Sequence, residues 1–313
     1  MPTARDWETR VLARIDRDEL VELTRQAIRF ASVNPPGDEA PLAEMLAAAL
    51  RREGIGVELV AHGPGRASVA ARLRGAGRRR GLILTGHLDV VGAGERPWRH
   101  DPFGGEVANG RVYGRGSSDM KGAVAAMLLA AAALRRAGAS LAGDLVLAFT
   151  AGEEVDGLGA EALATSGLLG GSDAVVIGEP SDLDVYVAEK GNLTVEIETA
   201  GRTAHASMPE LGVNAIYGMA DLIAALERWR PAGAPHPLLG EPTLSVGLVR
   251  GGVKSNVVPD GCVVEVDLRT LPGQVQARVL AELEELLTDL RRRRPGLEVR
   301  VSRTLGRAAV ETP

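Results

Sequence analysis

The chain has 313 residues, of which 45% are hydrophobic and 25% charged, and its net charge is -5. This composition is typical of a globular protein large enough for two domains, and it excludes the disordered and fibrous classes. The negative charge gives no general attraction for nucleic acid, so the arginine runs at 78–80 and 291–294 are interpreted as solvated surface. The single cysteine, Cys262, excludes an intrachain disulfide and a thiolate-rich zinc cluster.

The longest apolar run, at 122–134, is shorter than the roughly 20 residues that cross a bilayer. We therefore expect a buried helix there and no membrane partner. The first residues, MPTARDWETR, are charged and include no apolar stretch before a cleavage site, so they do not resemble a secretory signal. The expected location is the cytoplasm.

The first part of the chain alternates between helical and strand patterns. Apolar residues at helical spacing predict two N-terminal helices, separated by the turn-like segment SVNPPGD. The run GLILTG has the character of a buried parallel strand. The expected elements are helices at 10–30 and 40–52, strands at 57–59, 68–73 and 81–86, a helix after Ser117, a strand at 144–150, a helix at 160–166 and a strand at 174–177. This alternation predicts an α/β fold built on a sheet.

Beyond about residue 189 the order of the predicted elements changes. The patterns indicate a strand at 193–199, a helix at 213–229, strands at 243–249 and 261–270, a helix at 273–290 and a strand at 297–301. This β-α-β-β-α-β order is that of a ferredoxin-like unit. We therefore expect one domain at 1–188 and an inserted domain at 189–303, with 304–313 starting a return to the first domain.

Polar residues follow the apolar runs of the first domain, where open α/β sheets place their ligand sites. His87 and Asp89 follow GLILTG, Asp119 lies between GRGSS and a helix, Glu153 and Glu154 follow LVLAFTAG, and Glu179 follows AVVIG. Bringing one imidazole and five carboxylates together would be costly unless cations neutralised them. The pattern therefore predicts a metal site.

Each of these residues also has an ordinary structural interpretation. His87 alone could be a hydrogen-bonded loop histidine, and Asp119 could cap a helix. The three glutamates could be solvated loop acids or turn residues. Asp89, two residues after His87, can instead hold the imidazole in the tautomer that a metal ligand requires. The whole set favours the metal site.

These segments resemble the metal-dependent peptidases and deacylases that include acetylornithine deacetylase, succinyl-diaminopimelate desuccinylase, aminoacylase and glutamate carboxypeptidase. The matching segments, in the family's order, are TGHLDVV, GRGSSDMKGA, TAGEEVDGLGA, VIGEPS and AGRTAHASMPELGVNAI. The resemblance runs from about residue 20 to 303. It implies a catalytic, zinc-peptidase-like mixed sheet flanked by helices, with an inserted ferredoxin-like lid and dimerisation domain, and therefore a homodimer.

The resemblance also implies roles for the residues of the first domain. Asp119 would bridge two divalent ions, with His87 and Glu179 completing the shell of one ion and Glu154 serving the other. Glu153 would be the general base that takes a proton from the attacking water and passes it to the leaving amine. Oxygen and imidazole ligands suit Zn²⁺ best and also suit Co²⁺ or Mn²⁺.

Three residues of the inserted domain match functional positions of the family. His205, in GRTAHAS, resembles a histidine that reaches the partner subunit's site and stabilises the oxyanion. Asn256, in KSNVVPD, and Arg269, in VDLRT, resemble the residues that hold the substrate's amide and carboxylate. A loop histidine and a surface salt bridge are the ordinary alternatives for His205 and Arg269.

The sequence departs from the family in one respect. The family's last metal ligand is a histidine in a C-terminal segment, whereas no histidine follows His236 here and the sequence ends at Pro313. We expect either a truncated chain or a natural fragment with an impaired second metal site. The predicted function is hydrolysis of small N-acyl amino acids, with a di- or carboxypeptidase, or an inactive dimerising or binding fragment, as alternatives.

Overall fold

The computed structural model describes residues 4–312 of the chain. It contains two compact units, the first ending at Leu183 and the second beginning at Asp184. The elements of the first unit are α1 (Ala4–Leu12), α2 (Arg17–Arg29), α3 (Ala40–Arg52), β1 (Gly56–Gly63), β2 (Arg66–Leu73), β3 (Gly81–His87), β4 (Glu106–Ala108), β5 (Arg111–Tyr113), α4 (Lys121–Arg136), β6 (Leu145–Thr150), α5 (Leu158–Thr165) and β7 (Ser172–Ile177). None of the helices within residues 4–312 is both long and apolar enough to span a bilayer.

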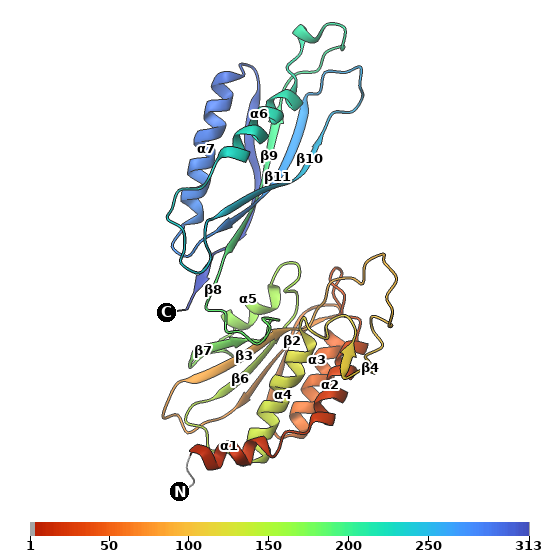
Figure 1. Ribbon diagram of the computed structural model, residues 1–313, viewed down its shortest axis with the longest axis vertical. Coiled ribbons are helices and arrows are strands. Elements are labelled where there is room, and N and C mark those ends of the chain that lie inside the picture. The colour runs from red at the N-terminus through yellow and green to blue at the C-terminus, as the bar shows by residue number, and fades with distance from the viewer. Residues whose placement is uncertain (1–3, 313) are drawn as a thin grey trace. The chain divides into compact units, whose positions relative to one another are not determined.

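The first unit is built on a mixed five-stranded sheet in the order β1-β2-β6-β3-β7. Strand β3 lies between β6 and β7 and runs parallel to both, whereas β1 and β2 are antiparallel to their neighbours. Figure 1 shows this sheet with α2, α3 and α4 beside it. The α/β sheet with flanking helices is therefore confirmed, and the parallel centre follows from the strand-helix-strand order of the chain.

Two cores lie on opposite faces of this sheet, because successive side chains of a strand point to opposite sides. On one face Leu145, Leu147 and Phe149 of β6 join the core formed with α2, α3 and α4. On the other face Val146 and Ala148 pack in a smaller core with residues of α5. The all-apolar sequence of β6 therefore reflects burial on both sides.

The N-terminal helices differ from the prediction. The single helix expected at 10–30 is wrong, because the chain forms α1 and α2 with a break between them. Asp16 causes the break: its extended backbone starts α2, and its side chain accepts hydrogen bonds from the backbone N–H groups of Asp18 and Glu19. The helical periodicity continues across the break, so it masked this N-cap.

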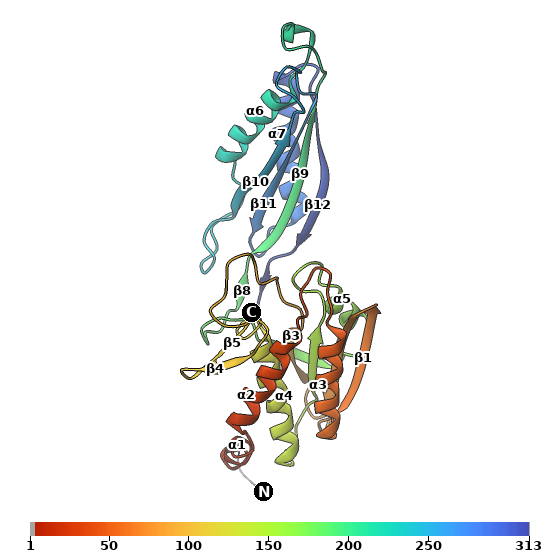
Figure 2. The same cartoon turned by 90° about the vertical axis from the view of Figure 1, so that its right-hand side faces the viewer.

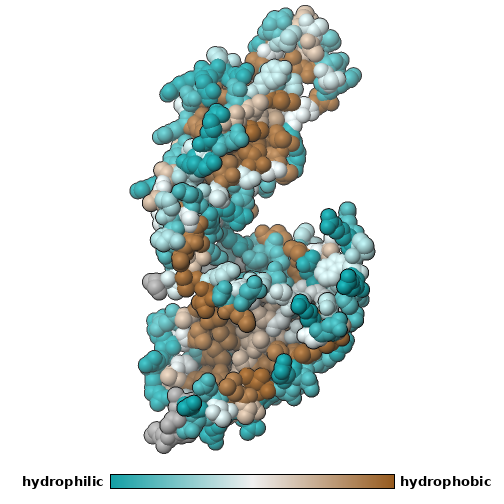
Figure 3. All heavy atoms as spheres, viewed as in Figure 1, coloured by the Kyte–Doolittle hydropathy of each residue, from teal (hydrophilic) through white to brown (hydrophobic). Residues whose placement is uncertain are grey.

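Strand β7 forms one edge of the sheet and is exposed along most of its length. Its apolar side chains remain in solvent: Val175 is 55% exposed, Val176 48% and Ile177 61%. Figure 3 shows apolar side chains gathered on this side of the unit. The last four residues of β7, AVVI, are as apolar as β6, but β7 lies at the edge of the sheet and β6 at its centre.

The second unit contains β8 (Ala188–Glu189), β9 (Gly191–Ala200), the 3₁₀ turn η1 (Pro209–Leu211), α6 (Ala215–Arg228), β10 (Thr243–Gly251), β11 (Gly261–Thr270), α7 (Gln276–Arg293), β12 (Glu298–Arg307) and β13 (Val310–Glu311). Its antiparallel sheet has the order β10-β11-β9-β12. Helices α6 and α7 share one core with one face of the sheet, as Figure 2 illustrates. The ferredoxin-like β-α-β-β-α-β order is therefore confirmed.

The end of the second unit differs from the expectation that residues 304–313 leave it. Strand β12 continues to Arg307 along the whole of β9, and a bulge between Val301 and Arg303 lets it follow the neighbouring strand. The short strand β13 then pairs with β8. Residues 304–311 therefore pair with other strands of the second unit.

Candidate metal centre

The candidate ligands of the first unit stand at the carboxyl ends of its three parallel strands. His87 is the last residue of β3 and pairs in register with Thr150, the last residue of β6. Glu153 and Glu154 follow β6, and Glu179 follows β7. Since the carboxyl ends of parallel strands lie at the same edge of a sheet, the fold brings these residues together.

Three side chains form a group that could hold a metal ion, namely His87, Asp119 and Glu154. One ligand atom from each lies within 4.8 Å of those of the other two. The Nε2 atom of His87 is 2.9 Å from Oδ1 of Asp119 and 3.5 Å from Oε1 of Glu179. The structure thus brings His87, Asp119 and Glu154 together, and the Glu179 carboxylate lies beside His87.

Hydrogen bonding orients His87 for metal binding. Its Nδ1 atom lies 2.9 Å from the backbone carbonyl oxygen of Asp89. Because a carbonyl can only accept, Nδ1 donates to it. Nε2 would donate to the Asp119 carboxylate when the ring is protonated, and it would offer its lone pair to a metal ion that replaced this proton. The sequence prediction had the Asp89 side chain in this role, but its Oδ1 is 3.6 Å away, and the backbone of the same residue makes the shorter contact.

The Asp89 carboxylate instead ties together three segments around the centre. It is fully buried, and it accepts hydrogen bonds from the backbone N–H groups of Glu153 and Glu154, each at 3.1 Å. The Asn34 side chain donates a further bond to it at 2.9 Å. The segment SVNPPGD predicts only a turn at Asn34. Its position before two prolines gave no sign of a partner 55 positions away.

The charges of the centre perturb one another strongly. Burial lowers the pKa of His87, but the Asp89 carboxylate and the charge of Glu179 outweigh burial and raise it to about 9. Burial raises the pKa of Glu154 and of Glu179, and His87 lowers both. The negative charges of the neighbouring carboxylates add to the effect of burial and raise the pKa of both glutamates. The acids therefore repel one another, and a bound cation would relieve that repulsion.

The donor set fits divalent ions in chemistry and in spacing. Two atoms that each lie 2.0–2.2 Å from a Zn²⁺ ion are at most about 4.4 Å apart, close to the spread of this group. The His87 side chain is 2% exposed, whereas those of Asp119 and Glu179 are 52% and 45% exposed. The imidazole is therefore buried, whereas these two carboxylates are open to solvent.

Lys121 is a second residue near the centre whose role the sequence did not predict. Lys121, the first residue of α4, is fully buried, and its Nζ donates a 2.6 Å hydrogen bond to the backbone oxygen of Phe30. Burial lowers the pKa of Lys121 to about 8, while the charge of Asp89 raises it. This contact fixes the start of α4, two residues beyond Asp119. In the sequence, the only sign of this role is a lysine at the start of an otherwise apolar helical segment.

In the second unit the structure brings two of the three expected residues close together in the fold. His205 forms an isolated β-bridge with Val257, and the N–H of Ala206 donates to the carbonyl of Asn256 at 3.0 Å. The His205 side chain is exposed, and its Nδ1 lies 2.7 Å from the Ser207 hydroxyl. His205 and Asn256 therefore belong to adjacent loops.

Arg269 lies elsewhere in the same unit. It is near the end of β11, whose first residue, Gly261, is close to the Asn256 loop. At about 3.4 Å per residue the strand separates the two ends by more than 20 Å. Asp267 binds one edge of the Arg269 guanidinium, accepting from Nε at 2.7 Å and from Nη2 at 3.0 Å. Arg269 therefore forms the ordinary ion pair that was the alternative interpretation.

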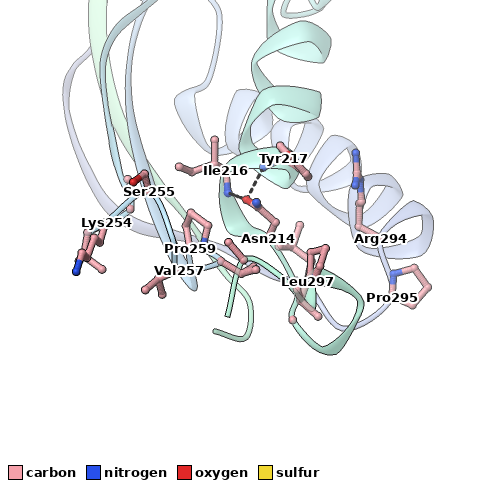
Figure 4. A pocket seen from close by; sticks show the side chains of 18 of the residues that line it. Asn214, Ile216, Tyr217, Lys254, Ser255, Val257, Pro259, Arg294, Pro295 and Leu297 are labelled. Atoms are coloured by element: carbon pink, nitrogen blue, oxygen red, sulfur yellow. Dashed lines mark hydrogen bonds between the residues drawn. The ribbon is translucent and has the colours of Figure 1, made fainter. Parts of the chain in front are cut away.

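The loops of His205 and Asn256 border a hollow of about 870 Å³ in the second unit. Ala206, Ser255 and Val257 belong to its lining, as does the start of α6. Figure 4 shows the Asn214 side chain accepting hydrogen bonds from the backbone N–H groups at the start of this helix. The helix end is thus already capped, and the wall of the hollow is fixed.

Comparison with known proteins places these observations in a family. Residues 83–303 match the profile of Peptidase family M20/M25/M40. Acetylornithine deacetylase from Proteus mirabilis is 34% identical over 290 residues, which are 88% of this chain and 73% of that protein. A probable succinyl-diaminopimelate desuccinylase from Staphylococcus epidermidis is 37% identical over 148 residues, 47% of this chain, and the match spans only 36% of that relative.

Solved structures share the fold at lower identity. The M20 family metallo-carboxypeptidase Sso-CP2 from Sulfolobus solfataricus has a TM-score of 0.74 at 20% identity, over 96% of this chain and 80% of its own. Aminopeptidase PepT from Bacillus cereus has a TM-score of 0.74 at 22% identity, over 96% of this chain and 79% of its own. Both matches include the mixed sheet and the inserted ferredoxin-like unit.

Proposed function

Since the chain belongs to Peptidase family M20/M25/M40, we propose that it is a two-metal amidohydrolase that cleaves the amide of a small N-acyl amino acid. One observation carries this proposal: His87, Asp119 and Glu154 offer ligand atoms within 4.8 Å of one another at the carboxyl edge of the sheet. The names of the deacetylase and desuccinylase relatives support an acyl group as the part removed.

In this proposal Asp119 would contribute to the binding of two ions, His87 and Glu179 would help to hold one of them, and Glu154 would help to hold the other. Zn²⁺ suits these ligands best, and Co²⁺ or Mn²⁺ would also be accepted. Bound ions would supply Lewis acidity, which polarises the amide carbonyl and makes water a better nucleophile. The hydrogen bond that keeps the proton on Nδ1 of His87 leaves Nε2 free for its ion.

Glu153 is the proposed general base. The Asp89 carboxylate accepts hydrogen bonds from the backbone N–H groups of Glu153 and Glu154. It therefore anchors the proposed base and the neighbouring proposed ligand. Glu153 would take a proton from the attacking water and give it to the leaving amine. Asp89 acts through these contacts and is a positioning residue.

The second unit is the proposed lid and dimerisation domain. His205 would stabilise the oxyanion of a partner subunit's site, for which its exposed ring is available. Asn256, in the adjacent loop, would hold the substrate's amide in the same partner site as His205, because it lies too far from Arg269 for both to hold one small substrate within one chain. Arg269 would bind the substrate's carboxylate after releasing Asp267, which now binds its Nε and Nη2.

A di- or carboxypeptidase is the second candidate, because the solved relatives of this fold include a metallo-carboxypeptidase and an aminopeptidase. Both candidates use the same centre and differ in the group on the acyl side. A substrate panel separates them: N-acetyl and N-succinyl amino acids should be cleaved faster than dipeptides. Faster cleavage of the dipeptides would reject the deacylase assignment.

A non-catalytic dimerising or binding protein is the remaining alternative. Metal analysis and an assay on this chain distinguish it from both hydrolases. Two bound ions together with turnover would eliminate it. One ion or none, without turnover on any substrate of the panel, would reject the amidohydrolase proposal instead.

A further inference from the structure

A hollow of about 430 Å³ in the first unit lies outside the candidate metal centre. It is lined by Arg96, Pro97, Trp98, Arg99, His100 and Tyr113. The volume lies within the roughly 300–1,000 Å³ typical of small-molecule sites. The chain has only three tryptophans, three tyrosines and five histidines, and one of each borders this hollow. Aromatic side chains are therefore concentrated here beyond what the composition would supply.

The rings of the hollow are held in place. The indole N–H of Trp98 donates to the backbone oxygen of Ala93 at 2.9 Å, and the Arg115 guanidinium lies 5.2 Å from the centre of the same ring. On the other wall His100 stacks on Tyr113 with a centroid distance of 4.0 Å and an interplanar angle of 26°. Rings fixed in this way lose little conformational entropy when a ligand packs against them.

Two cations at the hollow have no protein partner. Arg96 and Arg99 are exposed, and neither forms an ion pair or hydrogen bond with another residue in the part of the chain that the structure describes. The nearby acids are largely occupied, since Glu106 lies 2.8 Å from His100 Nδ1 and Asp101 accepts from the N–H of Phe103. The guanidinium groups are therefore free to bind an anion.

The hollow lies on the segment 90–118, which joins the residues that follow β3 to the start of α4. Arg115 links its two ends, because its Nη2 donates to the backbone oxygen of Gly92 at 3.2 Å while its guanidinium covers Trp98. Tyr113 ends the β4–β5 hairpin, which is separate from the five-stranded sheet (Figure 2). The hollow thus has its own local scaffold.

From these features we propose that the hollow is a binding site for a small aromatic carboxylate. The flat ring of such a ligand would pack against Trp98, and its carboxylate would accept hydrogen bonds from Arg96 and Arg99. A flat apolar body with a charged end matches the pairing of fixed rings with unpaired guanidinium groups. The site does not depend on the hydrolytic activity of the metal centre.

The test measures benzoate binding to the full chain by isothermal titration calorimetry. The double variant Arg96→Gln with Arg99→Gln should bind benzoate about tenfold more weakly or not detectably, because the charge-assisted hydrogen bonds are lost. The matched control is Arg78→Gln with Arg79→Gln, two exposed arginines before β3 that carry the same change in net charge. The control should retain the affinity of the unaltered chain.

Two further ligands test the contributions of the aromatic ring and of the negative charge to binding separately. Benzyl alcohol keeps the ring without the charge, and cyclohexanecarboxylate keeps the charge without the flat ring, so both should bind about tenfold more weakly than benzoate. Unchanged benzoate affinity in the Arg96 and Arg99 double variant, or equal binding of either analogue, would overturn the proposal. So would the absence of benzoate binding to the unaltered chain. None of these readouts involves turnover, so their failure leaves the proposed amidohydrolase function untouched.

Discussion

The two units support their polar side chains in different ways. In the first unit His87 and Asp89 are buried and hydrogen-bonded, and the open ligands Asp119 and Glu179 lie around them. In the second unit His205 and Asn256 stand on exposed loops, and Arg269 is occupied by Asp267. The difference teaches that the first group is organised before any ligand binds, whereas the second group has no comparable buried support. Substitutions in the first unit should accordingly have the larger effects.

The largest effect is expected at Asp119, the proposed shared ligand. Asp119→Ala should lose bound metal and bring hydrolysis to the background rate, because one carboxylate serves both ions. Elemental analysis of the purified variant, together with the substrate panel, measures both effects. Ser118→Ala is the matched control in the same loop and should retain both. Full metal content in Asp119→Ala would contradict the shared-ligand assignment.

The next largest effect separates chemistry from metal binding. Glu153→Gln should keep its metal and lose hydrolysis by about 10²–10⁴-fold, the usual contribution of a general base. Parallel measurements of metal content and kcat test this. Activity near that of the unaltered chain would remove Glu153 from the role of base and leave the metal centre intact.

In the second unit His205 should be the most sensitive residue. His205→Ala is expected to reduce kcat by about 10²–10³-fold, by analogy with the loss of one oxyanion donor, with metal content unchanged. Ser207→Ala, which removes the hydroxyl 2.7 Å from the ring, serves as the control and should have a much smaller effect. Equal effects of the two substitutions would indicate a role in loop structure only.

A smaller effect is expected from the buried support of the first unit. Asp89→Ala should weaken metal affinity by about 10–100-fold, the usual result of losing a residue that orients metal ligands. Asn34→Ala removes only one of the hydrogen bonds to this carboxylate and should weaken affinity less. Competition with a chelator measures both. Unaltered affinity in Asp89→Ala would mean that the ligands hold their positions without it.

The smallest effect is expected at Arg269. Arg269→Ala should raise KM about tenfold for substrates with a free carboxylate, with little change in kcat, if the guanidinium exchanges Asp267 for the substrate. Asp267→Asn is the informative companion, because it releases the guanidinium and should leave KM unchanged or lower it. A KM unaffected by Arg269→Ala would assign this arginine to the ion pair alone.

Much of the fold follows from local patterns. The short apolar runs predicted the strands of both sheets, and the change in element order near residue 189 predicted the ferredoxin-like unit. Patterns were less informative where one signal hid another, as at Asp16, which starts a new helix inside a continuous helical periodicity. The AVVI end of β7 is as apolar as β6, and only the sheet order shows that β7 is an edge strand and β6 a buried one.

The candidate ligands could be identified from the sequence because His87, Glu154 and Glu179 lie at the end of an apolar strand or within a few residues of it, and parallel strands end at one edge. The sequence by itself therefore determined the family and the candidate ligand set. Tertiary structure decided which groups support that set, such as Asn34 beneath Asp89. It also assembled the aromatic hollow around Trp98. Such contacts depend on how distant segments pack, and because side-chain hydrogen bonds and ring contacts act over only a few ångströms, spacing along the chain does not encode them.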